Sequence, residues 1–379
     1  MAHRTILTPK QREVLFGLPA DEAQLLKHYT LSDEDLDHIG QRRRPRNRLG
    51  FALQLCALRY PGRALLPGEV IPVEIADFLA AQLGLKDADL DAYAAREETR
   101  HEHMASLRQL YGYRTFSGRG ARDLKLWLHG QAEHAVSNED IARRFVEECR
   151  RTLTILPAIS TIERLCADAL VAAEKRIETR IADRLSDDEC VALDDLLFEM
   201  VEDRLTRFVW LRKFEVGNNS AAARRLLDRL DYLRKIDVSP DAFHDVPDHR
   251  ITRLRRQGER YFADGLRDLP GDRRHAILAV CVSEWRRAIA DAVVETHDRI
   301  VGRTWREAAR LCDDRMDGAQ PEVQKTLRSF RDMGAALLEA KNDDVSLEDA
   351  ISSSPGWTDL QTLVAVAARL TDTLSSDPI

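Results

Sequence analysis

The sequence lacks the patterns that mark a membrane or secreted protein. No apolar run approaches the length of about 18 residues that a membrane-spanning helix needs. The N-terminal residues, MAHRTILTPK, contain no apolar signal-peptide core. The six cysteines are scattered and none forms a CxxC pair, so we expect reduced core residues in a cytoplasmic protein rather than disulfides or zinc ligands.

Signatures of catalysis are also missing. The sequence has no GxxxxGK(S/T) phosphate loop, no GxGxxG and no GxSxG. Acid pairs such as Asp194–Asp195 fall where helix ends or loops are expected, and such residues usually cap helices or face water. The two histidines of the tripeptide HEH, His101 and His103, are too close in sequence to share one helix face, which disfavours a metal site. We therefore expect no cofactor and no catalysis by this chain alone.

Strand-like alternation and aromatic residues are scarce, which favours a helical fold. Aromatic residues make up 6% of the chain and charged residues 32%. This composition, with apolar residues at helical spacing, predicts an all-α protein of several domains. The net charge of -7 argues against a uniformly basic coat, so contacts with nucleic acid must lie on local patches.

The segment Gln41–Gly62, QRRRPRNRLGFALQLCALRYPG, contains no acidic residue although the whole chain is acidic. It follows a predicted helix with Ser32 as N-cap and Gly40 as C-terminal stop. An arginine run alone is as often a solvated face or a disordered arm. Two short helices joined by a turn, the second beginning with arginines, are typical of a helix-turn-helix domain. The candidate DNA-binding residues are Arg42, Arg43, Arg44, Arg46 and Arg48, which we expect to hold phosphates, and Arg59 at the helix end.

Helical spacing divides the second of these helices into two faces. Leu49, Leu53 and Cys56 belong to a stripe that we expect to face the core. Asn47 and Gln54 belong to the other face, and their amide groups suit an adenine edge in the major groove, so we predict that both read bases. Phe51, on the same face, suits either a thymine methyl group or the core, and the spacing leaves both open.

A second basic group lies between residues 96 and 125. Its members on the predicted helix Leu90–Tyr111 extend the apolar stripe of that helix, so they need an anionic partner if they are buried. Phosphates would supply one, and so would nearby acids such as Glu97 and Asp123; the pattern leaves both open. The candidate DNA-binding residues of this group are Arg96, Arg100, His103, Arg114, Arg119, Arg122 and Lys125.

Helix caps and loop signals divide the chain further. Ser186 and Glu189 have the spacing of a capping box. Loops are expected at 61–72, 112–122 and 237–247, with later helix breaks at Gly271, Gly318–Pro321 and Ser352–Gly356. We expect a helix-turn-helix-like DNA-binding domain at 1–70, a second helical DNA-binding domain at 71–155, a helical end-recognition or linker domain at 156–240 and a helical linker or scaffold domain at 241–379.

Several blocks of the sequence resemble a known family. The run HYTLSDEDLDHIGQRRRPRNRLGFALQLCALRYPGR (His28 to Arg63) resembles the N-terminal signature of the Tn-three family of replicative transposases. The similarity continues in YAAREETRHEHMASLRQLYGYRTF (Tyr93 to Phe116) and ILPAISTIERL (Ile155 to Leu165). Weaker blocks, HDRIVGRTW and MGAALLEAK, extend the resemblance over nearly the whole chain.

The resemblance implies a part in DNA transposition. Family members recognise the terminal inverted repeats of their transposon through N-terminal helical domains, and they cut and join DNA with a C-terminal RNase-H-like domain that carries an Asp-Asp-Glu triad and magnesium. We expect that catalytic domain to lie outside these 379 residues. Double-stranded DNA is the expected partner, a homodimer is possible and no membrane is expected. The alternative function is a stand-alone regulator that occupies transposon ends.

Overall fold

The computed structural model describes residues 5–19, 21–66, 68–85, 97–201, 205–342, 346–353 and 356–375, with the backbone alone at 315–320, 353, 370 and 372–375. Over these ranges the fold is all-α, as the composition predicts, apart from two pairs of two-residue strands that were not predicted. None of the helices in the described ranges is both long and apolar enough to cross a bilayer.

The chain divides into two compact units. Unit 1 comprises residues 1–212 and 235–285, and unit 2 comprises residues 213–234 and 286–379. The four-domain division expected from the sequence stays a prediction. The two units are defined by contacts within the chain, and such contacts do not test which segments bind DNA.

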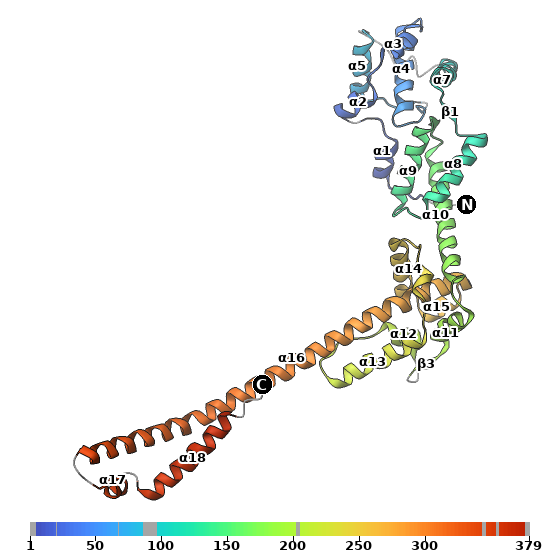
Figure 1. The fold of residues 1–379 in the computed structure, drawn as a ribbon. Helices are drawn as coiled ribbons and strands as arrows, with labels where there is room; N and C mark the ends of the chain where they lie inside the picture. The colour runs from blue at the N-terminus through green and yellow to red at the C-terminus, as the bar shows by residue number, and fades with distance from the viewer. Residues whose placement is uncertain are drawn as a thin grey trace. The chain divides into compact units, whose positions relative to one another are not determined.

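Unit 1 begins with helices that form one apolar cluster. These helices are α2 (Glu22–His28), α3 (Asp33–Gly40), α4 (Pro45–Arg59), α5 (Val73–Gln82) and α7 (Glu97–Tyr111). Their apolar side chains, with Tyr29, Ile39, Phe51, Leu79 and Leu107 fully buried, form one continuous core. Helix α4 contacts α3, α5 and α7, so it lies at the centre of this cluster (Figure 1).

A second apolar cluster of unit 1 joins the start of the chain to residues 116–173. It is built from α1 (Pro9–Phe16), α8 (Gly118–Gln131), α9 (Asn138–Arg151) and α10 (Ile159–Ala182). Figure 1 shows α8, α9 and α10 side by side, in agreement with their mutual contacts. Phe145 and Ile162 are fully buried at its centre. Strand β1 (Arg114–Thr115) pairs in parallel with β2 (Thr154–Ile155), which fixes the end of α7 beside the end of α9.

The remainder of unit 1 packs around the C-terminal half of α10. It contains α11 (Asp187–Phe198), β3 (Met200–Val201) paired with β4 (Leu205–Thr206), α12 (Arg207–Arg212), the 3-10 helix η1 (Pro240–Phe243), α14 (Asp248–Arg260), α15 (Ala263–Arg267) and the start of α16 (Gly271–Asn342). The predicted capping box is confirmed: Glu189 N donates to Ser186 Oγ at 3.2 Å, and Ser186 N donates to Glu189 Oε2 at 2.7 Å. The buried Arg250 of α14 donates to carbonyl oxygens at the end of α8, namely those of Ala132, Glu133 and Ala135.

Unit 2 consists of most of α13 (Ser220–Lys235), the rest of α16, α17 (Leu347–Ser353) and α18 (Trp357–Ser375). Arg369 of α18 is ion-paired with Glu322 of α16 at 2.8 Å.

Two local predictions need correction. Helix α8 begins at Gly118, inside the loop expected at 112–122, because Ala121, Leu124 and Leu128 have helical spacing and pack into the core despite the nearby glycines. Helix α16 continues through Gly318–Pro321, where a break was expected. An internal proline removes one hydrogen bond and crowds the carbonyl group four residues earlier, at a cost of about 3 kcal/mol, and the helix forms in spite of that cost.

Candidate nucleic-acid interface

The turn between α3 and α4 carries the first arginine group. Helix α3 begins at Ser32, whose Oγ accepts from Asp35 N at 3.2 Å, and α4 begins with Pro45 at its first position. The side chains of Arg43 and Arg44 are exposed, and that of Arg46 is half-buried. The two-helix arrangement with arginines at the start of the second helix is therefore as the sequence predicts, and Arg43 and Arg44 are free to meet a phosphate.

Two other arginines of this group have structural partners. The guanidinium of Arg42 lies 4.4 Å from the centre of the Phe51 ring and donates to Ser106 Oγ at 2.8 Å, which links α4 to α7. Arg48 donates to the carbonyl oxygens of Arg42, at 2.8 Å, and Gly40, at 3.3 Å, at the end of α3. These groups hold the turn in shape, because each donates to an acceptor within the protein.

The division of α4 into a core face and a DNA face is wrong. Every residue from Leu49 to Leu58 is buried, and Phe51 belongs to the core. Gln54 is 3% exposed, so its amide cannot reach a base edge while the helix stays in place. The physical reason is that α3, α5 and α7 cover α4 on all sides, as expected for a helix that is apolar around most of its circumference. Asn47, half-buried in the first turn, remains the candidate for base contact.

Arg59 is part of a polar network inside the first cluster. It donates to both carboxylate oxygens of Asp35, at 2.6 and 2.9 Å, and the hydroxyl of Tyr111 donates to Asp35 Oδ1 at 2.9 Å. Burial alone would raise the pKa of Asp35, but hydrogen bonds from Arg59, Ser32 and Tyr111 lower it to about 2. The network ties α3, α4 and α7 together, so the guanidinium of Arg59 is already engaged within the protein.

The α7 residues of the second basic group differ in exposure. His103 is 4% exposed and lies edge-on to Phe51, with 5.2 Å between ring centres. Burial, and after it the positive charge of Arg42, lower the pKa of His103 to about 4, so the ring is neutral near pH 7 and carries no charge for a phosphate. Arg100 is half-buried, and Arg96 lies outside the described residues.

Helix α8 carries the basic residues that the structure leaves exposed. Its apolar side chains Ala121, Leu124 and Leu128 are buried, which turns the opposite face to solvent. Arg119 is in an exposed contact with Asp123 at 3.8 Å, whereas the side chain of Arg122 makes no hydrogen bond or ion pair within the described part of the chain. The exposed basic residues of this face are Arg119, Arg122 and Lys125, and Arg114 is exposed on β1 beside them.

Two further arginines near this face were not among the sequence candidates. Arg108, at the end of α7, and Arg151, at the end of α9, line the same cavity as Arg114. Sequence reasoning missed them because the pairing of β1 with β2 brings together segments about 40 residues apart in the chain. The spacing of residues within α7 or α9 does not indicate that the ends of these two helices lie close together.

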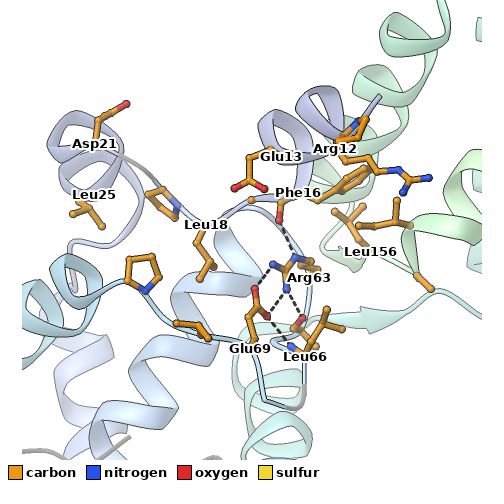
Figure 2. Close-up of a pocket in the computed structure, with 18 of the residues that line it drawn as sticks. Arg12, Glu13, Phe16, Leu18, Asp21, Leu25, Arg63, Leu66, Glu69 and Leu156 are labelled. Carbon is orange, nitrogen blue, oxygen red and sulfur yellow. Dashed lines mark hydrogen bonds and ion pairs between the residues drawn. The ribbon is translucent and has the colours of Figure 1, made fainter. Parts of the chain in front are cut away.

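A larger cavity of unit 1 has a different character. It has a volume of about 1210 Å³ and lies between α1, the loop before α5 and the start of α10 (Figure 2). Its two arginines are engaged: Arg63 is paired with Glu69 at 2.5 Å, and Arg12 with Glu163 at 2.7 Å. Glu13 and Asp21 also line it, and Figure 2 shows apolar side chains over much of the wall. Such a cavity does not suit the phosphates of nucleic acid.

Comparisons with known proteins show which sequences this chain resembles. Residues 6–169 match a family described as a domain of unknown function, DUF4158. The chain is 30% identical over 98% of its length to the transposase for transposon Tn21 from Escherichia coli, of which it covers 37%. It is 30% identical, with the same coverage, to the transposase for transposon Tn501 from Pseudomonas aeruginosa. The transposase for transposon Tn1546 from Enterococcus faecium is 28% identical over 97% of the chain.

These matches confirm the resemblance drawn from the sequence blocks. The chain spans little more than a third of the length of the curated relatives it matches, at their N-terminal side. Over this part of their length, the chain resembles the Tn-three family of transposases.

Proposed function

We propose that this chain binds double-stranded DNA at the terminal inverted repeats of a transposon, as the N-terminal part of a transposase. The observation that carries the proposal is the amphipathic helix α8, which buries Leu124 and Leu128 and exposes Arg119, Arg122 and Lys125 on the other side. In a protein with a net charge of -7, an exposed row of cations without strong partners is a local attraction for phosphates.

The similarity to transposases supports the choice of DNA as the partner. The relatives are transposases, and the match covers 98% of this chain, including both basic groups. Arg43 and Arg44, exposed at the α3–α4 turn, supply a second set of phosphate contacts. Asn47 lies next to that turn and is the residue proposed to contact a base.

The proposal is tested by electrophoretic mobility shift with the inverted repeat of the parent element and a scrambled duplex of equal length. With about six phosphate contacts, affinity falls about a thousandfold between 50 and 200 mM salt. The repeat is expected to bind more tightly than the scrambled duplex at every salt concentration. Equal affinity for both would leave only non-specific binding and would contradict end recognition.

A pair of matched variants tests the role of α8. Arg122→Gln is expected to weaken binding to both duplexes equally and to reduce the slope of log affinity against log salt by about 1. The control is Arg143→Gln, also exposed on a helix of unit 1 but ion-paired with Glu139 at 2.7 Å, and we expect it to bind as the unchanged chain does. Equal effects of both variants would mean that overall charge, and not the α8 face, determines affinity.

The homodimer stays a prediction, and analytical ultracentrifugation of the purified chain would test it.

A further inference from the structure

A cavity of about 590 Å³ in unit 1 is lined in part by Gly120, Asp123 and Trp127 of α8. It forms where the end of α7, β1, the first half of α8 and the end of α9 meet. The side chains that matter for its chemistry are Arg108, Arg114, Asp123, Glu148 and Arg151, together with the hydroxyl residues Thr115, Ser117, Thr152 and Thr154.

The charged groups of this wall fall into two sets. Arg151 donates to both carboxylate oxygens of Glu148, at 2.7 and 2.8 Å, and the exposed Arg119 lies 3.8 Å from Asp123. Both carboxylates of the wall are therefore already matched by an arginine. The guanidinium groups of Arg108 and Arg114 make no hydrogen bond or ion pair within the described ranges, so they leave a surplus of positive charge facing the cavity.

The position of Arg114 is fixed by the backbone. Arg114 pairs with Thr154 in the parallel β1–β2 ladder, and its backbone N–H donates to the carbonyl oxygen of Leu153 at 2.8 Å. Leu153 has a φ of 51°, a left-handed conformation that costs free energy in a residue with a Cβ and is concentrated at functional sites. The hydroxyls of Thr115 and Ser117 on the same wall are hydrogen-bonded to each other at 3.0 Å, which leaves one O–H group of the pair to donate to a ligand.

We propose that this cavity holds one phosphate of the DNA backbone, with Arg108 and Arg114 as its charged ligands and one hydroxyl of the Thr115 and Ser117 pair as a neutral donor. The inference rests on the proposed DNA binding and adds a defined phosphate position to it. Guanidinium groups suit this ligand because their N–H groups match the oxygens of a phosphate. Gly120 and Asp123 of α8 line the cavity, and the exposed Arg119 lies 3.8 Å from Asp123, so a strand that contacts Arg119 passes next to the cavity.

The test compares the Arg108→Gln, Arg114→Gln double variant with the unchanged chain on the inverted repeat and on scrambled DNA. The double variant loses one phosphate contact, which reduces the fall in affinity between 50 and 200 mM salt by about 3.5-fold. We expect the double variant to bind both duplexes more weakly and by the same factor. Glu148→Gln, which releases Arg151, is expected to strengthen binding a few-fold. Thermal melting of each variant confirms that the fold is kept.

A chemical scan of the DNA locates the phosphate itself. Neutral methylphosphonate groups are placed one at a time along the inverted repeat. At one position the substitution is expected to weaken binding of the unchanged chain several-fold and to have no effect on the double variant. The same penalty at every position for both proteins would overturn the inference.

Separate outcomes distinguish this inference from the proposed function. An unchanged chain that does not bind DNA would overturn both. A chain that binds DNA, is weakened by Arg122→Gln and is unaffected by the double substitution would overturn the cavity assignment alone. Calorimetry with inorganic phosphate is the last arm: a double variant that loses affinity for inorganic phosphate but keeps its DNA affinity would assign the cavity to a free anion and overturn the inference.

Discussion

Helices α4 and α8 both begin in arginine-rich segments, yet the structure uses their arginines in opposite ways. Helix α4 is buried along Leu49–Leu58, and Arg42, Arg48 and Arg59 around it bind groups of the protein itself. Helix α8 buries a single stripe, and Arg119 and Arg122 stay on the surface. The comparison teaches that an arginine cluster becomes a candidate DNA contact only where packing leaves its guanidinium groups unmatched.

The largest expected effect comes from breaking the inner network of the first cluster. Arg59→Ala leaves the carboxylate of Asp35, 1% exposed, without its charged partner. We expect the free energy of unfolding to fall by about 2–4 kcal/mol, since removing one member of a buried pair leaves an uncompensated charge. Arg122→Ala on α8 is the control and should change the free energy of unfolding by less than about 0.5 kcal/mol. Urea unfolding measures both.

A rescue sharpens that experiment. Adding Asp35→Asn to Arg59→Ala removes the unmatched charge, so part of the lost stability is expected to return. Equal, small effects of Arg59→Ala and Arg122→Ala would contradict the contrast between the two helices.

A smaller effect is expected from the pH dependence of the first cluster. The folded protein holds the pKa of His103 at about 4, below its usual value of 6.5. Between these two values the unfolded chain binds a proton that the folded chain does not, so stability falls as pH drops from 6.5 to 4. The contribution of His103 has a slope of up to about 1.4 kcal/mol per pH unit. Urea unfolding across this pH range should show a shallower slope for His103→Gln, and an unchanged slope would refute the assignment.

The smallest expected change in stability comes from Leu153, the residue before β2. Leu153→Gly relieves a left-handed conformation that costs an L-residue about 1–2 kcal/mol, partly offset by the flexibility of glycine. We expect a net stabilisation of about 0.5 kcal/mol. Leu126→Gly is the matched control, because Leu126 is exposed within α8 and glycine there should destabilise by about 1 kcal/mol. Thermal melting that gave both variants the same sign would contradict the strain at Leu153.

Local signals predicted much of the helical framework. The N-cap at Ser32, the end of α3 at Gly40 and the capping box of Ser186 and Glu189 are confirmed, because capping depends on side chains within three residues of the helix start. The same reasoning placed a break at Gly318–Pro321 that α16 does not have. The low helix propensity of glycine and proline at Gly318–Pro321 does not interrupt the helix, which continues on both sides of them.

The candidate site was predictable only in part, and the residues show why. The exposure of Arg43, Arg44, Arg119 and Arg122 agrees with their expected role, which stays a prediction until DNA binding is measured. The burial of Gln54 and His103 could not be foreseen, since a helical wheel shows which residues share a face but not how many faces other helices cover. The cavity at Arg108 and Arg114 depends on a strand pair between distant segments.

Composition predicted the all-α class, capping residues predicted the helix starts after Ser32 and Ser186, and long sequence blocks predicted the similarity to transposases, because all three are properties of neighbouring residues. Which arginines are available to a phosphate follows from the packing of the helices and could not be predicted from the chain alone. Their availability depends on which carbonyl, carboxylate or ring lies within a few ångströms of each guanidinium. Packing of α3 and α7 against α4 supplies those partners at Arg42 and Arg59, whereas no described residue supplies one to Arg122 on the open face of α8.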